Sequence, residues 1–261
     1  MGRPVIFCVP HPDDETLGAG VSIAEHVAAG RDVRILLMTR GTGSGAIRKV
    51  NGTNWSPWWG VWHNPAVEGY QPLGEEEFGA SRMRELMAAI GCLGVSAEHV
   101  YEASALLGEP VLDGSVTQDQ ARRAILALAA TLDPAAGHPG LWTPTWLVDD
   151  NPDHIAVGKA SRQLGVEDPV WWGDRRYWVL PPYWQDARLG QIAGEFWDTP
   201  NNAGTEVAIE IQRRARNACL AYKAWAPQQG MYAIGYHSVD GMFAAMDGST
   251  STNPPKCLIH K

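Results

Sequence analysis

The sequence predicts an α/β fold of the Rossmann-like type: a mostly parallel sheet with helices on both faces and long Trp-rich loops. Short apolar, β-prone runs alternate with segments of helical periodicity through much of the chain. Polar motifs directly follow two of these runs, and open α/β sheets carry their sites at the carboxyl ends of strands. We see no repeat and no internal linker, so one domain over residues 1–261 is expected.

The first 77 residues predict a βαβ unit followed by an insert. Val5–Val9 and Asp32–Thr39 are expected as strands, and Leu17–Ala28 is expected as the helix between them. Residues 41–77 then form an insert loop, which opens with a Gly-rich turn and contains Trp55. Irregular inserts of this length are usually functional loops or lids.

Predicted strands and helices continue to alternate along the rest of the chain, up to a C-terminal segment that has no sustained hydrophobic periodicity. Residues 226–261 are therefore expected to be irregular. The remaining predicted strands are Val95–Tyr101, Leu141–Val148 and Tyr177–Leu180, and the remaining predicted helices are Phe78–Leu93, Gln118–Leu132 with Thr117 as N-cap, Ile155–Leu164 and Glu206–Trp225.

Composition and charge exclude several classes of function. The net charge of −8 argues against a nucleic-acid partner, because no basic stripe is present to neutralise phosphates. No stretch approaches the roughly 20 apolar residues that span a bilayer, and the N-terminus lacks a signal-peptide pattern. We therefore expect a cytoplasmic protein without a membrane anchor, and the sequence leaves the oligomeric state open. The four cysteines are widely spaced and are expected to be buried apolar residues.

A candidate metal site follows the first predicted strand, in His11-Pro12-Asp13-Asp14-Glu15. His11 and Asp14 are three residues apart on a turn that enters a helix, so both side chains can converge on one ion. The alternative is that the acids only stabilise the helix N-terminus through its macrodipole. Asn151-Pro152-Asp153-His154 brings a second histidine to the same expected sheet edge. Two histidines and one aspartate form a three-ligand zinc set with an open position for water, and Asp13 becomes a candidate general base.

These motifs resemble those of the PIG-L/LmbE-type zinc-dependent N-acetylglucosaminyl deacetylases. The resemblance covers roughly residues 4–165 and includes Arg82-Met83-Arg84-Glu85, which matches the family's R-x-x-E segment. It implies one zinc ion per chain held by His11, Asp14 and His154, with Asp13 as the base. It also implies that Arg82 helps to hold the substrate or the released acetate. The alternative for Arg82 is an ion pair with Glu85 on the helix surface.

The chain departs from this family at Asn151, where the family usually has histidine. An asparagine amide can donate a hydrogen bond to a developing oxyanion, but it cannot deliver a proton. Either Asp13 performs both proton transfers or another residue helps. His237 lies in a Gly-containing segment that could fold over the site, so it is the candidate for that second role and for a contact with the substrate.

The expected reaction is hydrolysis of an N-acetyl or N-acyl group from a small acetamido-sugar conjugate. Trp55 and the other tryptophans of the insert predict a wide apolar mouth. The alternative is that nucleotide composition or core filling explains the twelve tryptophans. A wide mouth would suit a glycopeptide-antibiotic precursor, while a thiol-precursor pseudodisaccharide and a chitobiose-type sugar stay open. Two other functions also stay open: a zinc amidohydrolase acting on another small amide, and a non-catalytic sugar- or metal-binding protein on the same scaffold. Asp13 favours catalysis, and the divalent ion could differ from zinc.

Overall fold

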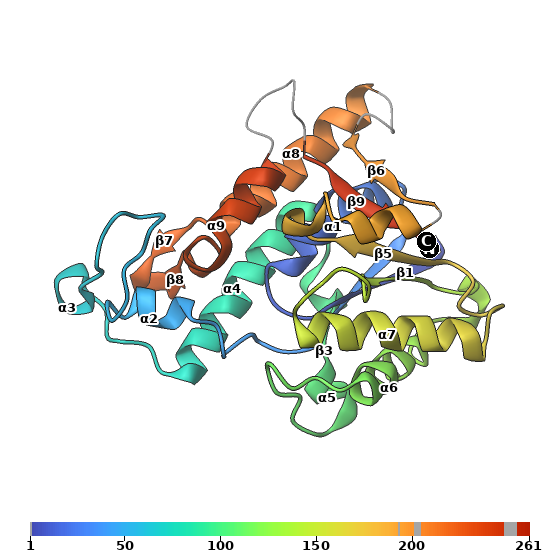
Figure 1. Ribbon diagram of the computed structural model, residues 1–261, viewed down its shortest axis with the longest axis horizontal. Coiled ribbons are helices and arrows are strands. Elements are labelled where there is room, and N and C mark those ends of the chain that lie inside the picture. Colours follow the sequence, from blue (N-terminus) through green and yellow to red (C-terminus); the bar gives the residue numbers. More distant parts are fainter. Residues whose placement is uncertain (1, 193, 201–204, 248–254) are drawn as a thin grey trace.

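The computed structural model describes residues 2–192, 194–200, 205–247 and 255–261. Its main sheet has seven strands in the order β3-β2-β1-β4-β5-β9-β6 (Figure 1). The first five strands in this order are parallel, and β9 is antiparallel to both β5 and β6. Their bounds are β1 Pro4–Val9, β2 Asp32–Leu37, β3 Val100–Glu102, β4 Gly140–Pro144, β5 Arg175–Val179, β6 Phe196–Asp198 and β9 Cys257–His260.

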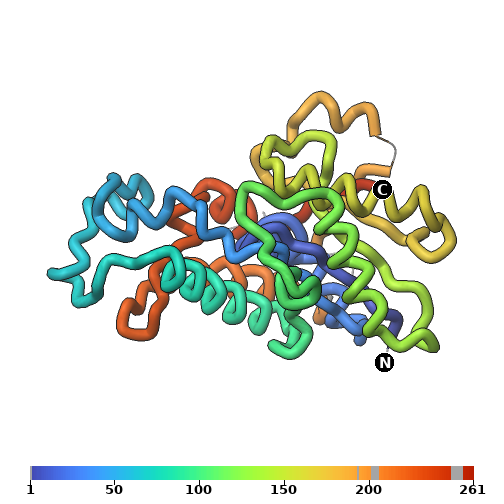
Figure 2. Tube along the Cα trace, turned by 90° about the horizontal axis from the view of Figure 1, so that it is seen from below, coloured from blue at the N-terminus to red at the C-terminus, as the bar shows by residue number. Residues whose placement is uncertain are grey.

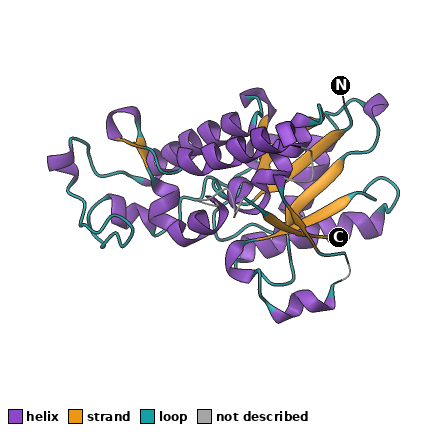
Figure 3. Ribbon diagram, turned by 90° about the horizontal axis from the view of Figure 1, so that it is seen from above, coloured by secondary structure: helices purple, strands orange, loops and turns teal. Residues whose placement is uncertain are grey.

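The sheet is covered by helices on both faces, as Figure 3 shows. Successive side chains of a strand point to opposite faces. Accordingly, Val5, Phe7 and Val9 of β1 belong to one hydrophobic cluster, while Ile6 and Cys8 belong to another. The first cluster is closed by helices α1 (Asp14–Ala28), α4 (Glu75–Leu93) and α8 (Thr205–Ala221), and the second by α6 (Gln118–Ala129) and α7 (Pro152–Glu167). The predicted α/β class with helices on both faces is therefore confirmed.

Strand β1 is the point at which the strand order reverses. It pairs with β2 on one side and with β4 on the other. Ligands of open α/β sheets bind in the crevice outside the carboxyl ends of the strands at such a switch point. Both sequence motifs, after β1 and after β4, therefore reach the same edge.

The prediction that residues 226–261 are irregular is wrong. This segment contains strand β8 (Met231–Tyr232), which pairs with β7 (Trp225–Ala226), helix α9 (Ile234–Asp247) and strand β9 inside the main sheet. The periodicity was hidden because α9 carries Gly235 and Gly241 and bends at Val239, whose φ of −142° and ψ of 47° are not helical.

The insert of residues 41–77 is also less irregular than predicted, because it contains α2 (Ala46–Val50) and α3 (Pro65–Glu68). Both helices are too short to give a periodic signal. Figure 2 shows the insert beside the C-terminal segment at one end of the molecule, and Ser56 Oγ lies 2.9 Å from His237 Nδ1 across that contact.

Several boundaries differ from the prediction. Strand β3 is shorter than the predicted Val95–Tyr101, because Ala97–His99 forms a 3-10 turn. Helix α7 begins at Pro152, three residues before the predicted start. The Thr117 N-cap of α6 is confirmed, with a reciprocal capping box to Gln120. A short helix, α5 (Ala103–Leu107), and strand β6 were not predicted. Among the described residues no helix is both long enough and apolar enough to span a bilayer.

The cysteines form no disulfide. Three of the four are buried as predicted, while Cys92 is partly exposed.

Candidate metal centre

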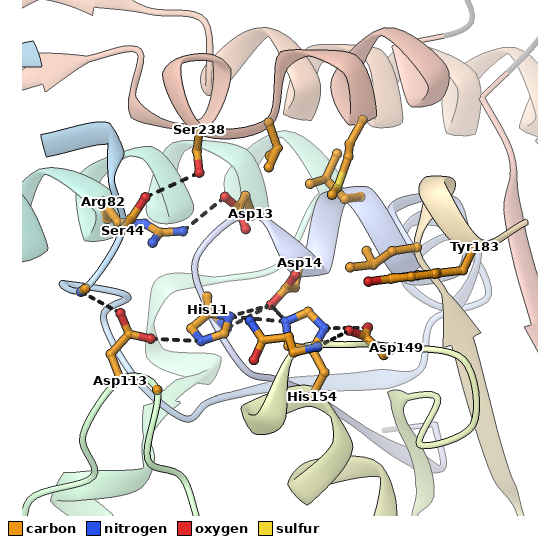
Figure 4. A pocket seen from close by; sticks show the side chains of 17 residues that line it. His11, Asp13, Asp14, Ser44, Arg82, Asp113, Asp149, His154, Tyr183 and Ser238 are labelled. Atoms are coloured by element: carbon orange, nitrogen blue, oxygen red, sulfur yellow. Dashed lines mark hydrogen bonds and ion pairs between the residues drawn. The ribbon is translucent and has the colours of Figure 1, made fainter. Parts of the chain in front are cut away.

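The three predicted metal ligands meet at the carboxyl edge of β1 and β4. His11 follows β1, Asp14 is the first residue of α1, and His154 lies in the first turn of α7. All three are buried and line a cavity of about 560 Å³ (Figure 4). Because two helices begin at this edge, their N-terminal turns direct side chains of both motifs toward one point.

The geometry of these side chains fits a tetrahedral ion. His11 Nδ1 lies 3.2 Å from His154 Nε2 and 3.3 Å from Asp14 Oδ2, and His154 Nε2 lies 3.1 Å from the same carboxylate oxygen. Ligand atoms bonded at about 2.1 Å in a tetrahedral zinc site are roughly 3.4 Å apart. The three atoms therefore need only small shifts to hold one ion, and a fourth position remains for water or substrate.

The second nitrogen of each imidazole faces carboxylates. His154 Nδ1 lies 2.8 Å from Asp149 Oδ2, whereas His11 Nε2 lies 3.0 Å from Asp113 Oδ1 and 3.1 Å from Asp153 Oδ2. Such outer partners fix the tautomer and the ring orientation of metal-binding histidines. Sequence reasoning missed Asp113 and Asp149. Asp149 carries a signal, because it lies two residues before the second motif, whereas Asp113 lies in no motif.

The charged groups of the site shift one another's pKa values. Burial lowers the pKa of His154, but the Asp14 charge and the hydrogen bonds to Asp14 and Asp149 outweigh burial and raise the pKa to about 9. Burial also opposes the charged form of His11, and its carboxylate partners raise its pKa well above the usual value. For Asp14, burial is outweighed by the two histidines, which hold its pKa well below the usual range. Without metal, the pocket therefore keeps protons on its imidazoles.

Asp13 lies next to this ligand group in an unusual backbone conformation. Its φ of 111° is in the region that residues with a side chain rarely adopt, and such strain collects at functional sites. The buried Glu15 carboxylate stabilises the turn by accepting the Asp13 backbone N–H at 3.0 Å. Burial raises the pKa of Asp13 to about 6, although the positive charge of Arg82 opposes the shift.

Arg82 is buried in the site and is not part of a surface ion pair. Its Nη2 lies 3.0 Å from Asp13 Oδ2, and its Nη1 donates to the Gly41 carbonyl at 2.8 Å. Glu85, its proposed alternative partner, instead accepts the backbone N–H groups of Ile234 and Gly235, where α9 begins. The two residues of the R-x-x-E segment therefore serve different purposes, since one binds Asp13 and the other anchors α9.

Asn151 caps α7 and lines the cavity. Its side-chain oxygen accepts the Asp153 backbone N–H at 2.9 Å, and this bond fixes the orientation of the amide. Because the oxygen is engaged, the Nδ2 group is the donor that the amide can offer to a ligand.

Two predicted substrate contacts lie away from the cavity. Trp55 is 42% exposed in the insert, where its ring packs on Trp62 at a centroid distance of 6.2 Å. His237 is 1% exposed, contacts Ser56 and stacks on Trp59, so it cannot reach the site as placed. Among the described residues that line the cavity there is no tryptophan, so the structure does not place the predicted Trp-rich wall at this cavity. The residue after His237, Ser238, does line the cavity.

Comparisons with known proteins agree with this geometry. The model of the family described as PIG-L, GlcNAc-PI de-N-acetylase, matches residues 6–165. A 1D-myo-inositol 2-acetamido-2-deoxy-alpha-D-glucopyranoside deacetylase of Mycobacterium sp. (strain KMS) is 29% identical over 258 residues, which cover 88% of this chain and 76% of the relative.

Solved structures share the fold at lower identity. A triple-mutant deacetylase involved in the teicoplanin biosynthetic pathway has a TM-score of 0.59 at 17% identity, covering 99% of this chain and 96% of that chain. The 4-carboxy-2-hydroxymuconate hydratase GalB of Pseudomonas putida KT2440 has a TM-score of 0.55 at 13% identity, covering 99% of this chain and 95% of that chain. Since a hydratase and a deacetylase share this fold, the fold alone does not determine the reaction.

The family match does not depend on the fold alone. It spans both sequence motifs and the helix that carries Arg82, which together supply the three candidate metal ligands, Asp13 and Arg82. It also covers more than half of the chain. The chain therefore belongs to the PIG-L family of metal-dependent N-deacetylases.

Proposed function

We propose that this protein hydrolyses the N-acetyl group of a 2-acetamido sugar, using one zinc ion held by His11, Asp14 and His154. The proposal is carried by one observation: the buried carboxylate of Asp13 lies beside the three-ligand group and is held by Arg82. Two imidazoles and one carboxylate are a donor set that suits zinc. When bound there, zinc supplies a Lewis acid that lowers the pKa of water toward neutrality.

The residues of the chain provide the proton transfers. Arg82 holds Asp13 Oδ2, so we assign the proton to Oδ1, which takes it from the attacking water and returns it to the leaving amine. A pKa of about 6 suits both steps, because the carboxylate is ionised at neutral pH and its conjugate acid is still a usable donor. The Asn151 amide is assigned to the developing oxyanion as a hydrogen-bond donor.

The same assignments distinguish the proposal from its alternatives. A protein that only binds metal and sugar has no need for a carboxylate in a strained turn beside the ligands. An amidohydrolase that acts on a different small amide would have the same metal centre. It would differ only in that its substrate is not a sugar. The relative from Mycobacterium sp. is described as acting on an acetamidoglucosyl inositol, and this supports a sugar substrate.

We propose two substrates for a direct comparison. One is the acetamidoglucosyl inositol named for the curated relative, and the other is an acetylated glycopeptide-antibiotic precursor. The likeness to the teicoplanin-pathway deacetylase motivates the second substrate. The tryptophan argument no longer supports it, because Trp55 lies outside the cavity.

The proposal is tested with the zinc-loaded protein by measuring acetate release and metal content together. We expect one zinc per chain and acetate release from methyl N-acetyl-β-glucosaminide or from one of the two conjugates. Stoichiometric zinc without acetate release from any of the three would favour the binding protein. Release from simple acetamides as fast as from the sugars would favour the general amidohydrolase.

A further inference from the structure

The cavity beside the candidate metal centre has two chemically different flanks. One flank is polar and contains Gly43, Ser44, Asp113 and Ser238. The other flank is apolar and is built from Leu17, Leu180, Tyr183, Val239 and Met242. We infer that the apolar flank is a subsite for the acyl chain of the substrate, so that the protein prefers N-acyl groups longer than acetyl. This inference rests on the proposed function.

The apolar flank is one continuous surface although its residues are far apart in the sequence. All five side chains belong to a single hydrophobic cluster, in which Leu17 and Leu180 are buried and the other three are partly buried. They come from α1, from the turn that follows β5, and from α9. An apolar surface that stays partly open beside a polar centre favours an apolar ligand group.

The bend in α9 contributes to this flank. At Val239 the backbone leaves the helical region, and Val239 and Met242 both line the cavity. The preceding turn of α9 is held by the Glu85 carboxylate, which accepts the N–H groups of Ile234 and Gly235. The flank is therefore formed by an anchored element.

The position of the candidate metal ligands in the cavity determines which end of the substrate contacts which flank. The scissile carbonyl must lie near Asp13 and the metal ligands, so the sugar and the acyl chain extend from there in different directions. In Figure 4, Tyr183 lies on the opposite side of His154 from Ser44 and Asp113. Sugar hydroxyls need hydrogen-bond partners, which the polar flank offers. The acyl chain then contacts the apolar flank.

An acetyl group is too small to use this surface. Its single methyl covers only a fraction of four apolar side chains and the Tyr183 ring, and the cavity of about 560 Å³ has the size of sites for much larger ligands. Full burial of each added methylene is worth about fourfold in binding. A chain of six carbons should therefore raise kcat/KM by roughly tenfold or more, even if burial is incomplete.

Three matched probes test the inference with the zinc-loaded protein: methyl N-acetyl-β-glucosaminide, methyl N-hexanoyl-β-glucosaminide and hexyl N-acetyl-β-glucosaminide. The last two carry comparable alkyl chains at opposite ends of the sugar. Release of the free amine gives kcat/KM for each. We expect a gain of roughly tenfold or more for the hexanoyl compound and little gain for the hexyl glycoside. A hexanoyl value at or below the acetyl value overturns the inference, and so does an equal gain for the hexyl glycoside, which would assign the flank to the aglycone.

Failure of the proposed function gives a different result, because then neither the three probes nor the two conjugates release amine, and both proposals are overturned. Amine release from a conjugate but from none of the three probes overturns the inference alone. The subsite itself is tested with Met242→Gln, which should lower the hexanoyl-to-acetyl ratio of kcat/KM about fivefold. The matched control is Met87→Gln, because Met87 packs on the same cluster without lining the cavity. Ser44→Ala should lower both values by the same factor.

A second variant tests the subsite in case Met242→Gln does not fold. Val239→Thr keeps the shape of the side chain and adds one hydroxyl, and it should lower the same ratio in the same direction. An unchanged ratio in both Met242→Gln and Val239→Thr overturns the subsite.

Discussion

The guanidinium of Arg82 lies 3.0 Å from Asp13 Oδ2, and both side chains are buried beside the candidate metal ligands. Arg82 comes from the middle of α4, whereas Asp13 immediately precedes α1. An ion pair that is removed from water in this way fixes the carboxylate in one position and biases its proton affinity.

Replacing Asp13 with asparagine keeps the size of the side chain and removes the base. Loss of a positioned general acid–base group costs about 100- to 10,000-fold in rate, and we expect kcat to fall within this range. Zinc content should not change, because His11, Asp14 and His154 are intact. Acetate release and metal analysis on the same preparation measure both quantities. Near-normal turnover in the variant would assign the base elsewhere.

Replacing Arg82 with glutamine should shift the pH profile. The charge of Arg82 lowers the pKa of Asp13, so its removal raises that pKa above about 6. The base acts in its ionised form, and the ascending limb of kcat/KM therefore moves to higher pH, with lower activity at neutral pH. Arg82→Lys keeps the charge and should shift the limb less. A limb that does not move in Arg82→Gln would separate Arg82 from the proton transfers.

Zinc binding should compete with protons over a wide pH range. The imidazole of His154 has a pKa of about 9 without metal, and a metal ligand must be unprotonated. Below pH 9 each binding event at His154 therefore releases a proton. The apparent affinity should rise about tenfold per pH unit for each proton released, and the contribution of His154 should level off near pH 9. Calorimetry in buffers of different ionisation enthalpy counts the protons, and zero release at pH 7 would contradict the prediction.

Replacing Asp149 with asparagine should weaken zinc binding while leaving every ligand in place. Asp149 accepts from His154 Nδ1, and loss of such an outer carboxylate typically costs 10- to 100-fold in metal affinity. Asp150→Asn is the matched control, since the same change is made one residue away on an exposed side chain. Equal affinities of the two variants would show that Asp149 has no role in orienting His154.

The ligand group was predictable because it depends on the parallel sheet alone. The carboxyl ends of β1 and β4 meet at one edge, so His11, Asp14 and His154 converge once the two strands are recognised. The fold class followed from the alternation of apolar runs. The fold class rests on local periodicity, which a single sequence carries well, and the ligand group rests in addition on the residue types of the two motifs.

The residues that surround the metal ligands could not be predicted from the sequence, and the reason is physical. Asp113 reaches His11 from a loop with no motif, and its position depends on how that loop packs against the sheet edge. The apolar flank likewise depends on α9, whose helical pattern is interrupted by glycines and by the bend at Val239. Trp55 and His237 lie away from the cavity, because aromatic residues of the insert pack on one another and on the C-terminal segment.

Two substitutions of Asn151 separate its cap from its proposed role as an oxyanion donor. Serine can still accept the Asp153 N–H at the start of α7, whereas alanine cannot, and both lack the amide donor. We expect kcat to fall by about 100- to 1,000-fold in Asn151→Ser and in Asn151→Ala alike. Only the alanine variant should also lose stability, by about 1 kcal/mol in the free energy of unfolding. Steady-state kinetics and urea unfolding measure the two effects separately. A serine variant with full activity would remove Asn151 from the reaction and leave it as a helix cap.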